Sequence, residues 1–154
     1  MNVTIRRMTL EDVPAVHTID MLSFSLPWPE NSFRFELTGN PVSRSWVAES
    51  DGRTAAMLVL WLIVDEAHIA TLATHPDYRR MGIGEQLMIA ALQSARAEGA
   101  TRAFLEVRSG NSAAQTMYKK YGFVVAGIRQ RYYKDNNEDA ILMNLEDLSN
   151  LEAA

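Results

Sequence analysis

The sequence predicts an α/β fold with a mixed, mostly antiparallel sheet and flanking helices, and three observations support this prediction. Residues 44–50 and 53–64 have strand character and flank Asp51 and Gly52, a dipeptide typical of tight hairpin turns, so the two strands should pair antiparallel. Residues 66–107 alternate strand, helix and strand, which favours a right-handed crossover between two parallel strands. The composition, with 47% hydrophobic and 22% charged residues in 154, is that of a soluble globular domain.

The chain should open with a strand and a helix. Residues 3–7 predict a short strand. Thr9 and Asp12 have the spacing of a capping box, which predicts a helix that runs to about Met21. The proline-containing residues 25–30 should then form a loop, because proline breaks regular structure.

The middle of the chain should place a long helix between strands. A short helix is expected over residues 31–37 and should end at Gly39. After the hairpin, we expect a strand over residues 66–74, a loop over 75–81 and a helix over 83–98. The apolar face of that helix has the spacing of an amphipathic helix and consists of Ile83, Leu87, Ala91 and Ala95.

The last third should add three strands and one helix. Gly99 and Gly122 are expected to end helices. The expected elements are a strand over residues 102–107, a helix over 111–121, and strands over 123–133 and 140–145 with a turn at 135–137. We expect one domain over residues 1–147 and a frayed tail over 148–154.

Composition and charge exclude several kinds of protein. The sequence has no cysteine, which rules out disulfides and cysteine nucleophiles and fits a reducing cytoplasm. The longest apolar run, residues 55–64, is shorter than the roughly 20 residues of a membrane-spanning helix, and residues 1–10 do not resemble a secretory signal. A net charge of −4 gives no general attraction to nucleic acid. No cluster has metal-ligand spacing, and we expect no metal.

The sequence Arg79-Arg-Met-Gly-Ile-Gly84 lies between an expected strand and an expected helix. The first N–H groups of a helix have no partners, and the two glycines would let the backbone approach a pyrophosphate, with the arginines adding charge. A glycine pair can also simply make a turn. Leu87 stands where a Rossmann motif needs glycine, and Glu85-Gln86 stands where a P-loop needs Lys-Ser/Thr, so both motifs are disfavoured.

Together with residues 71–78, this segment resembles the Q/R-x-x-G-x-G/A signature of the GNAT superfamily of N-acetyltransferases. The resemblance implies that acetyl-CoA is the co-substrate and lies where two parallel strands splay apart. It also implies that strand backbone at residues 72–74 contacts the pantetheine arm, while N–H groups of residues 80–85 hold the pyrophosphate. The coenzyme-binding residues expected on this basis are Leu72, Ala73, Thr74, Arg79, Arg80, Met81, Gly82, Ile83, Gly84, Glu85 and Asn111.

Within the superfamily, the chain resembles the ribosomal-protein-alanine N-acetyltransferases over almost its whole length. The segments that carry this resemblance, besides the coenzyme motif, are residues 26–28, 65–67, 105–108, 111–118, 131–133 and 138–140. The chain departs from that family at residues 71–74, where Asn-Ile-Ala-Val is frequent, and at Lys134, where proline is frequent. The resemblance implies that the acceptor is a protein N-terminus, such as that of a ribosomal protein.

The expected reaction needs a base, because an α-amine with a pKa of about 8 is largely protonated at neutral pH and only the free amine attacks a thioester. Glu106 lies in the apolar run 103–107, so we expect a partly desolvated carboxylate with a raised pKa. It could equally be an exposed strand residue or a partner of Arg108. The resemblance implies that Glu106 is the proton acceptor, with Glu66 and His68 as reserve bases.

The departing coenzyme thiolate needs a proton donor. Tyr118 shares a helical face with Ala114 and Tyr121, which is typical of a core aromatic residue, but a neutral phenol can also protonate a thiolate. The resemblance implies that Tyr118 is that donor. Asn111 can cap its helix and also reach the coenzyme. Without a cysteine, direct transfer in a ternary complex is favoured over an acetyl-enzyme.

The acceptor should be enclosed by aromatic side chains on two loops. Trp28 lies on the proline-containing loop, and Tyr132 and Tyr133 lie near the C-terminal hairpin, where they could hold an extended peptide that begins with Ala or Ser. Two alternatives are an N-acetyltransferase for a small amine such as a polyamine and a noncatalytic acyl-CoA-binding module. A candidate base and acid count against the second. We expect a cytoplasmic monomer or homodimer with no direct nucleic-acid or membrane partner.

Overall fold

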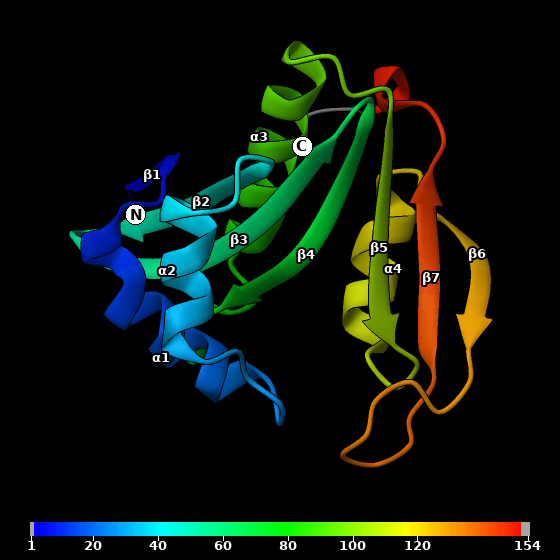
Figure 1. The fold of residues 1–154 in the computed structure, drawn as a ribbon, viewed down its shortest axis with the longest axis horizontal. Coiled ribbons are helices and arrows are strands. Elements are labelled where there is room, and N and C mark those ends of the chain that lie inside the picture. The colour runs from blue at the N-terminus through cyan, green and yellow to red at the C-terminus, as the bar shows by residue number, and fades with distance from the viewer. Residues whose placement is uncertain (1, 152–154) are drawn as a thin grey trace.

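The computed structural model of the protein describes residues 2–151, and within them seven strands form one sheet in the order β1-β2-β3-β4-β5-β7-β6 (Figure 1). The elements are β1 Val3–Arg7, α1 Val13–Ser23, α2 Glu30–Thr38, β2 Ser43–Ser50, β3 Arg53–Ile63, β4 Glu66–Thr74, α3 Ile83–Ala97, β5 Arg102–Arg108, α4 Ser112–Lys120, β6 Val124–Arg129 and β7 Ala140–Leu145. Among the paired strands, only β4 and β5 run parallel. The predicted mixed, mostly antiparallel sheet is confirmed.

Local sequence signals explain several element boundaries. Asp51 and Gly52 have φ angles of 52° and 80°, as a tight hairpin turn between β2 and β3 requires. The N–H of Thr9 donates to Asp12 Oδ2 at 2.7 Å, which confirms the capping box, although a 3₁₀ turn over Leu10–Asp12 precedes α1. The predicted hairpin and the predicted first helix are therefore both present.

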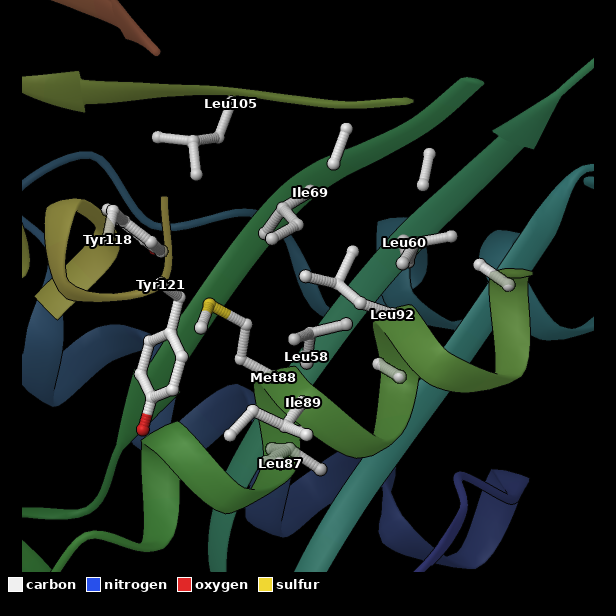
Figure 2. Close-up of a cluster of buried hydrophobic side chains, with 14 of the residues drawn as sticks. Leu58, Leu60, Ile69, Leu87, Met88, Ile89, Leu92, Leu105, Tyr118 and Tyr121 are labelled. Carbon is white, nitrogen blue, oxygen red and sulfur yellow. The ribbon is translucent and has the colours of Figure 1, made fainter. Parts of the chain in front are cut away.

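Helices cover both faces of the sheet (Figure 1). The helices α1 and α2 lie on one face, and α3 and α4 lie on the other. Strand β3 is buried on both faces: Met57 and Val59 pack on the α1 side, whereas Leu58 and Leu60 pack on the α3 side. Figure 2 shows the α3 side of this core, where leucines from β3 meet Leu92 of α3. The residues predicted for the apolar face of α3 are all buried.

The parallel strands separate partway along their length. Pairing between β4 and β5 runs from Glu66 opposite Arg102 to Ile69 opposite Leu105. The next residue of β4, Ala70, is skipped in the pairing with β3. Such a bulge bends the strand that carries it, so β4 turns away at the point where its pairing with β5 stops. The expected splayed parallel pair is confirmed, and Figure 1 shows the two strands diverging.

The last part of the chain differs from the prediction at two places. The strand expected over residues 123–133 is shorter, because Arg131 has a φ of 52° and its N–H donates to Asp139 Oδ1 at 2.9 Å, which ends the extended backbone. The prediction of a frayed tail after about Leu148 was also wrong within the described residues. Leu148 is buried, its N–H donates to Thr101 O at 2.9 Å, and Leu151 packs against the core. Residues 152–154 lie outside the described part.

None of the described helices combines the length and apolar character needed to cross a bilayer.

Candidate active site

The turn before α3 presents the start of that helix as an anion site. Arg80 and Gly82 have φ angles of 66° and 76°, so the chain reverses sharply on either side of Met81. The N–H of Gln86 donates to Gly82 O at 3.1 Å as the first turn of the helix closes. The N–H groups of residues 83–85 precede this bond, and no carbonyl group of the same helix lies four residues before them to accept a hydrogen bond. They also carry the partial positive charge of the helix dipole. An anionic group would be stabilised here.

The two glycines of this turn serve different purposes. Gly82 provides the left-handed turn, and an added Cβ there would meet no atom within 4 Å. Gly84 has no unusual φ, but an added Cβ would lie 3.0 Å from Thr74 Oγ1. The absence of a side chain at Gly84 therefore lets α3 begin close against the end of β4.

Polar side chains near the turn hold the scaffold together. Arg79 donates from Nε to Thr74 O at 3.0 Å and from Nη2 to Ser23 Oγ at 3.1 Å, so it joins the end of β4 to α1. Glu85 accepts hydrogen bonds from Tyr121 Oη at 2.6 Å and from Lys120 Nζ at 3.1 Å. These bonds, that of Tyr121 first, lower the pKa of Glu85 and join α3 to α4. Because its carboxylate is negative and already bound, Glu85 can bind an anion only through its backbone N–H.

A cavity of about 570 Å³, here called the helix cavity, lies between the end of β4, the start of α3 and α4. Of the residues that the sequence assigns to the coenzyme, only Met81 does not line it, and its side chain is exposed. The residues from that set that line the cavity are Leu72, Ala73, Thr74, Arg79, Arg80, Gly82, Ile83, Gly84, Glu85 and Asn111. The structure thus brings nearly the whole predicted set together.

A second cavity of about 420 Å³, here called the strand cavity, opens where β4 and β5 diverge. Its walls are residues 69–72 of β4 and 105–108 of β5, and the loops before α2 and before β7 complete it. The lining residues that it shares with the helix cavity are Ser23, Phe24, Leu72, Asn111, Ala114 and Tyr118. The two cavities therefore adjoin, and a ligand that extends from the helix cavity past Leu72 would reach the strand cavity.

Tyr118 lies at the junction of the two cavities. Its side chain is nearly buried and packs on Phe123 with ring centroids 5.6 Å apart, so it is a core aromatic residue, and Figure 2 shows it near Leu105. Burial also raises the pKa of its phenol, which keeps the hydroxyl protonated. The two interpretations of Tyr118, as core residue and as proton donor, are thus compatible. Asn111 likewise caps α4 by accepting the N–H of Ala114 at 3.1 Å while it lines both cavities.

Glu106 lines the strand cavity. Its side chain is 34% exposed, so the carboxylate is partly covered, and its Oε1 lies 3.8 Å from Arg129 Nε. This partial exposure follows from the alternation of β5, because Leu105 and Val107 face the core while Glu106 points to the opposite face of the sheet. The suggested pairing with Arg108 is absent, since Arg108 binds Asp135 and Glu138 instead.

The reserve bases are bound to each other near the closed end of the strand pair. Glu66 accepts from Arg102 Nη2 at 2.7 Å and lies 2.9 Å from His68 Nε2. The imidazole of His68 stacks on Phe104 with centroids 5.1 Å apart. Glu66 lines none of the cavities described here, whereas His68 lines a third cavity of about 540 Å³, here called the aromatic cavity, which also reaches Glu106.

The predicted acceptor aromatics surround Glu106. Trp28 and Tyr133 line both the strand cavity and the aromatic cavity, and Tyr132 lines the aromatic cavity. The negative charge of Glu106 is the main cause of a raised pKa at Tyr132, and burial is the main cause at Tyr133, so both phenols stay neutral. The guanidinium of Arg108 lies 3.9 Å from the ring centroid of Tyr133.

The strand cavity also contains a buried carboxylate that the sequence predictions did not assign to the site. Asp20 of α1 is 1% exposed, and its Oδ2 accepts the N–H of Trp28 at 2.6 Å. The sequence does contain a signal for it. Asp20 continues the buried spacing of Val13 and Val16, so it is a carboxylate on the apolar face of its helix.

Comparisons with known proteins agree with this geometry. Residues 13–123 match the family described as "Acetyltransferase (GNAT) family". The chain is 42% identical over 139 residues, or 90% of this chain and 92% of the relative, to the putative [ribosomal protein bS18]-alanine N-acetyltransferase of Bacillus subtilis. It is 33% identical over 153 residues, covering 92% of this chain and 96% of the relative, to the [ribosomal protein bS18]-alanine N-acetyltransferase of Escherichia coli K12.

The solved structures include a similar protein. The crystal structure of the ribosomal-protein-S18-alanine N-acetyltransferase from Escherichia coli has a TM-score of 0.87 and 31% identity, and the match covers 99% of this chain and 97% of that one. This agreement extends over the sheet and the helices that form both cavities. The protein is therefore a member of the GNAT family of acetyltransferases.

Proposed function

We propose that this protein transfers the acetyl group of acetyl-CoA to the N-terminal amine of a protein that begins with a small residue, and that ribosomal protein bS18 is its acceptor. The observation that carries the proposal is the junction of the helix cavity and the strand cavity at Tyr118. One cavity has an anion site and the other has a carboxylate, so a coenzyme and an amine can meet between them. The names of the bacterial relatives support the acceptor.

The helix cavity suits coenzyme A in two respects. The free N–H groups at the start of α3 would bind its pyrophosphate. Beyond Ile69, β4 has no pairing with β5, so the backbone groups on that edge of residues 72–74 can pair with the amides of the pantetheine arm. The arm would then lead the thioester past Leu72 toward Tyr118, which lines both cavities.

The chemistry uses one base and one acid. The acceptor's ammonium group gives a proton to Glu106, directly or through a water molecule, and the free amine attacks the thioester carbon. The new carbon–nitrogen bond forms a tetrahedral intermediate, and the carbon–sulfur bond breaks as it collapses. The leaving thiolate takes a proton from Tyr118, and the surplus proton on the nitrogen returns to the phenolate through solvent. A ribosomal-protein acceptor would place this reaction in the cytoplasm.

Three acceptors would test the proposal. The first is a peptide with a free N-terminal Ala, the second is the same peptide with a blocked N-terminus and an internal Lys, and the third is spermidine. We expect rapid acetylation of the first alone, because Trp28, Tyr132 and Tyr133 enclose an extended chain around Glu106. Release of free coenzyme A measures the rate for all three. A preference for the blocked peptide or spermidine would contradict the assignment of the acceptor.

A further inference from the structure

The strand cavity carries more negative charge than the cations around it neutralise. It is lined by four carboxylates and one guanidinium. Arg108 Nη1 lies 3.1 Å from Asp135 Oδ1 and 3.2 Å from Glu138 Oε1, so its charge is shared between these two carboxylates. Glu106 has a distant partner, Arg129, at 3.8 Å. The remaining carboxylate is that of Asp20.

Asp20 has a buried charge without a cation. It takes part in no ion pair of the described residues. Its Oδ2 accepts the N–H of Trp28, and its Oδ1 accepts no hydrogen bond from residues 2–151. In that part of the chain, the side-chain atoms that are both buried and unpartnered belong to Trp46 and Ser50, so Oδ1 of Asp20 must open into the cavity that it lines.

A purely structural role explains the hydrogen bond between Asp20 and Trp28 but not the negative charge of Asp20. Accepting the N–H of Trp28 orders the loop before α2, but a neutral amide oxygen would accept that hydrogen bond equally well. A carboxylate withdrawn from water without a cation costs free energy, and that cost is offset when a cationic ligand binds. Burial raises the pKa of Asp20, against the smaller opposing effects of the Trp28 N–H and the charge of His17, as expected for a carboxylate without an ion partner.

We infer that Asp20 forms an ammonium-binding subsite in the strand cavity, which holds the protonated N-terminal amine of the acceptor until Glu106 removes its proton. This inference rests on the proposed function. At neutral pH, an N-terminal amine arrives mainly as the cation, so an anionic wall concentrates the form that is present in solution. Asp20 then serves binding, and Glu106 serves proton transfer.

The test is Asp20→Asn, which keeps an oxygen for the Trp28 N–H and removes the charge. With a peptide that begins with a free Ala, we expect the KM for the peptide to rise about tenfold, the effect of one charge-assisted hydrogen bond. The kcat at saturating peptide and the KM for acetyl-CoA should stay close to wild type. The control is Glu36→Gln, because Glu36 is also buried, accepts from Trp61 Nε1 and Asn40, and does not line the strand cavity.

Two further measurements separate charge from structure. The ratio of peptide KM between Asp20→Asn and wild type should fall toward one between about pH 7 and about pH 9.5, as the amine loses its charge. His17 and the charged groups that line the cavity, Glu106, Arg108, Asp135 and Glu138, are present in both proteins, so the ratio compares two proteins that differ in charge at Asp20 alone. An analogue with an N-terminal lactyl group, which has a hydroxyl in place of the amine, should inhibit both proteins equally.

The outcomes are distinct. The subsite would be overturned by an unchanged peptide KM in Asp20→Asn or by a KM ratio that is independent of pH. It would also be overturned if Asp20→Asn weakened binding of the lactyl analogue by the same factor as binding of the peptide. A thermal midpoint well below that of Glu36→Gln would show that the charge is needed for folding and would also overturn it. If the wild type does not acetylate the Ala peptide, the proposed function fails as well, whereas an active wild type matched by Asp20→Asn defeats this inference alone.

Discussion

Tyr118 combines a core position with the proposed role of proton donor. Its ring packs on Phe123, while its position gives access to the helix cavity and the strand cavity. The burial that packs the ring also raises the pKa of the phenol, so Tyr118 stays neutral and still carries its proton when the proposed thiolate departs beside it. A core position is therefore a good place for an acid that must stay neutral.

Tyr118→Phe removes the hydroxyl that is the proposed acid and keeps the ring. We expect kcat to fall on the order of 100-fold or more, with little change in the thermal midpoint, because packing on Phe123 is preserved. The matched control is Tyr121→Phe, which loses a hydrogen bond to Glu85 but has no hydroxyl in either cavity. Wild-type turnover in Tyr118→Phe would leave Tyr118 as a core residue only.

Glu106→Gln tests the base. The substitution preserves shape, so acetyl-CoA should still raise the thermal midpoint, while turnover at neutral pH falls about 100-fold. Raising the pH should restore part of the rate, because more of the acceptor amine arrives deprotonated. A pH–rate profile of both proteins measures this. Full activity at every pH would assign the base elsewhere, and His68 would be the next candidate, since Glu66 is already bound by Arg102.

At the scale of elements, the start of α3 depends on how closely it approaches β4. Gly84 makes this approach possible, because any side chain there would begin 3.0 Å from Thr74 Oγ1. The same turn exposes the free N–H groups to the helix cavity. The turn that contains Gly84 therefore determines both the position of α3 and its capacity to bind an anion.

Gly84→Val should abolish the stabilisation by acetyl-CoA. The branched side chain would push α3 from β4 and obstruct the approach of a pyrophosphate, so the rise in thermal midpoint with acetyl-CoA should disappear while the fold persists. NAD and ATP should stabilise the wild type much less. Gly99→Ala is the control. Gly99 has a φ of 109°, so a side chain there strains the backbone at the far end of α3, away from the proposed pyrophosphate site. An intact acetyl-CoA shift in Gly84→Val would contradict this role of the turn.

The elements were predictable where local signals fix them, and less so where tertiary contacts decide. Asp51-Gly52 located the hairpin, and the period of α3 located its buried face. The end of β6 was misplaced because the left-handed backbone at Arg131 depends on a hydrogen bond to the distant Asp139. The sequence left both a covered and an exposed position open for Glu106, because an apolar run does not reveal that one face of β5 remains open.

At the scale of the whole molecule, the divergence of β4 and β5 separates two parts of the sheet, and loops join them again across the strand cavity. Ser25, in the loop before α2, donates to Asp135, in the loop between β6 and β7. Arg108 binds the second loop through Asp135 and Glu138, and its guanidinium covers the ring of Tyr133. The strand cavity, which is the proposed acceptor site, is thus bordered by contacts between residues far apart in the sequence.

Arg108→Met tests whether this bridge shapes the entrance. The substitution keeps an aliphatic stem and removes the charge, so residues 130–139 should loosen and the KM for an Ala peptide should rise by about fivefold or more, the cost of losing charge-assisted hydrogen bonds. Because Arg131 and Lys134 are exposed within that loop, trypsin should cleave there faster than in the wild type. The thermal shift with acetyl-CoA should remain, since Arg108 does not line the helix cavity.

Arg102→Met is the matched control for this experiment. It removes an arginine from the same strand whose partner, Glu66, lies at the closed end of the strand pair. A general weakening of β5 would affect both variants, whereas loss of the bridge affects Arg108→Met alone. Because the contact between Ser25 and Asp135 does not depend on Arg108 directly, unchanged proteolysis and unchanged peptide KM would show that this contact suffices to hold the entrance.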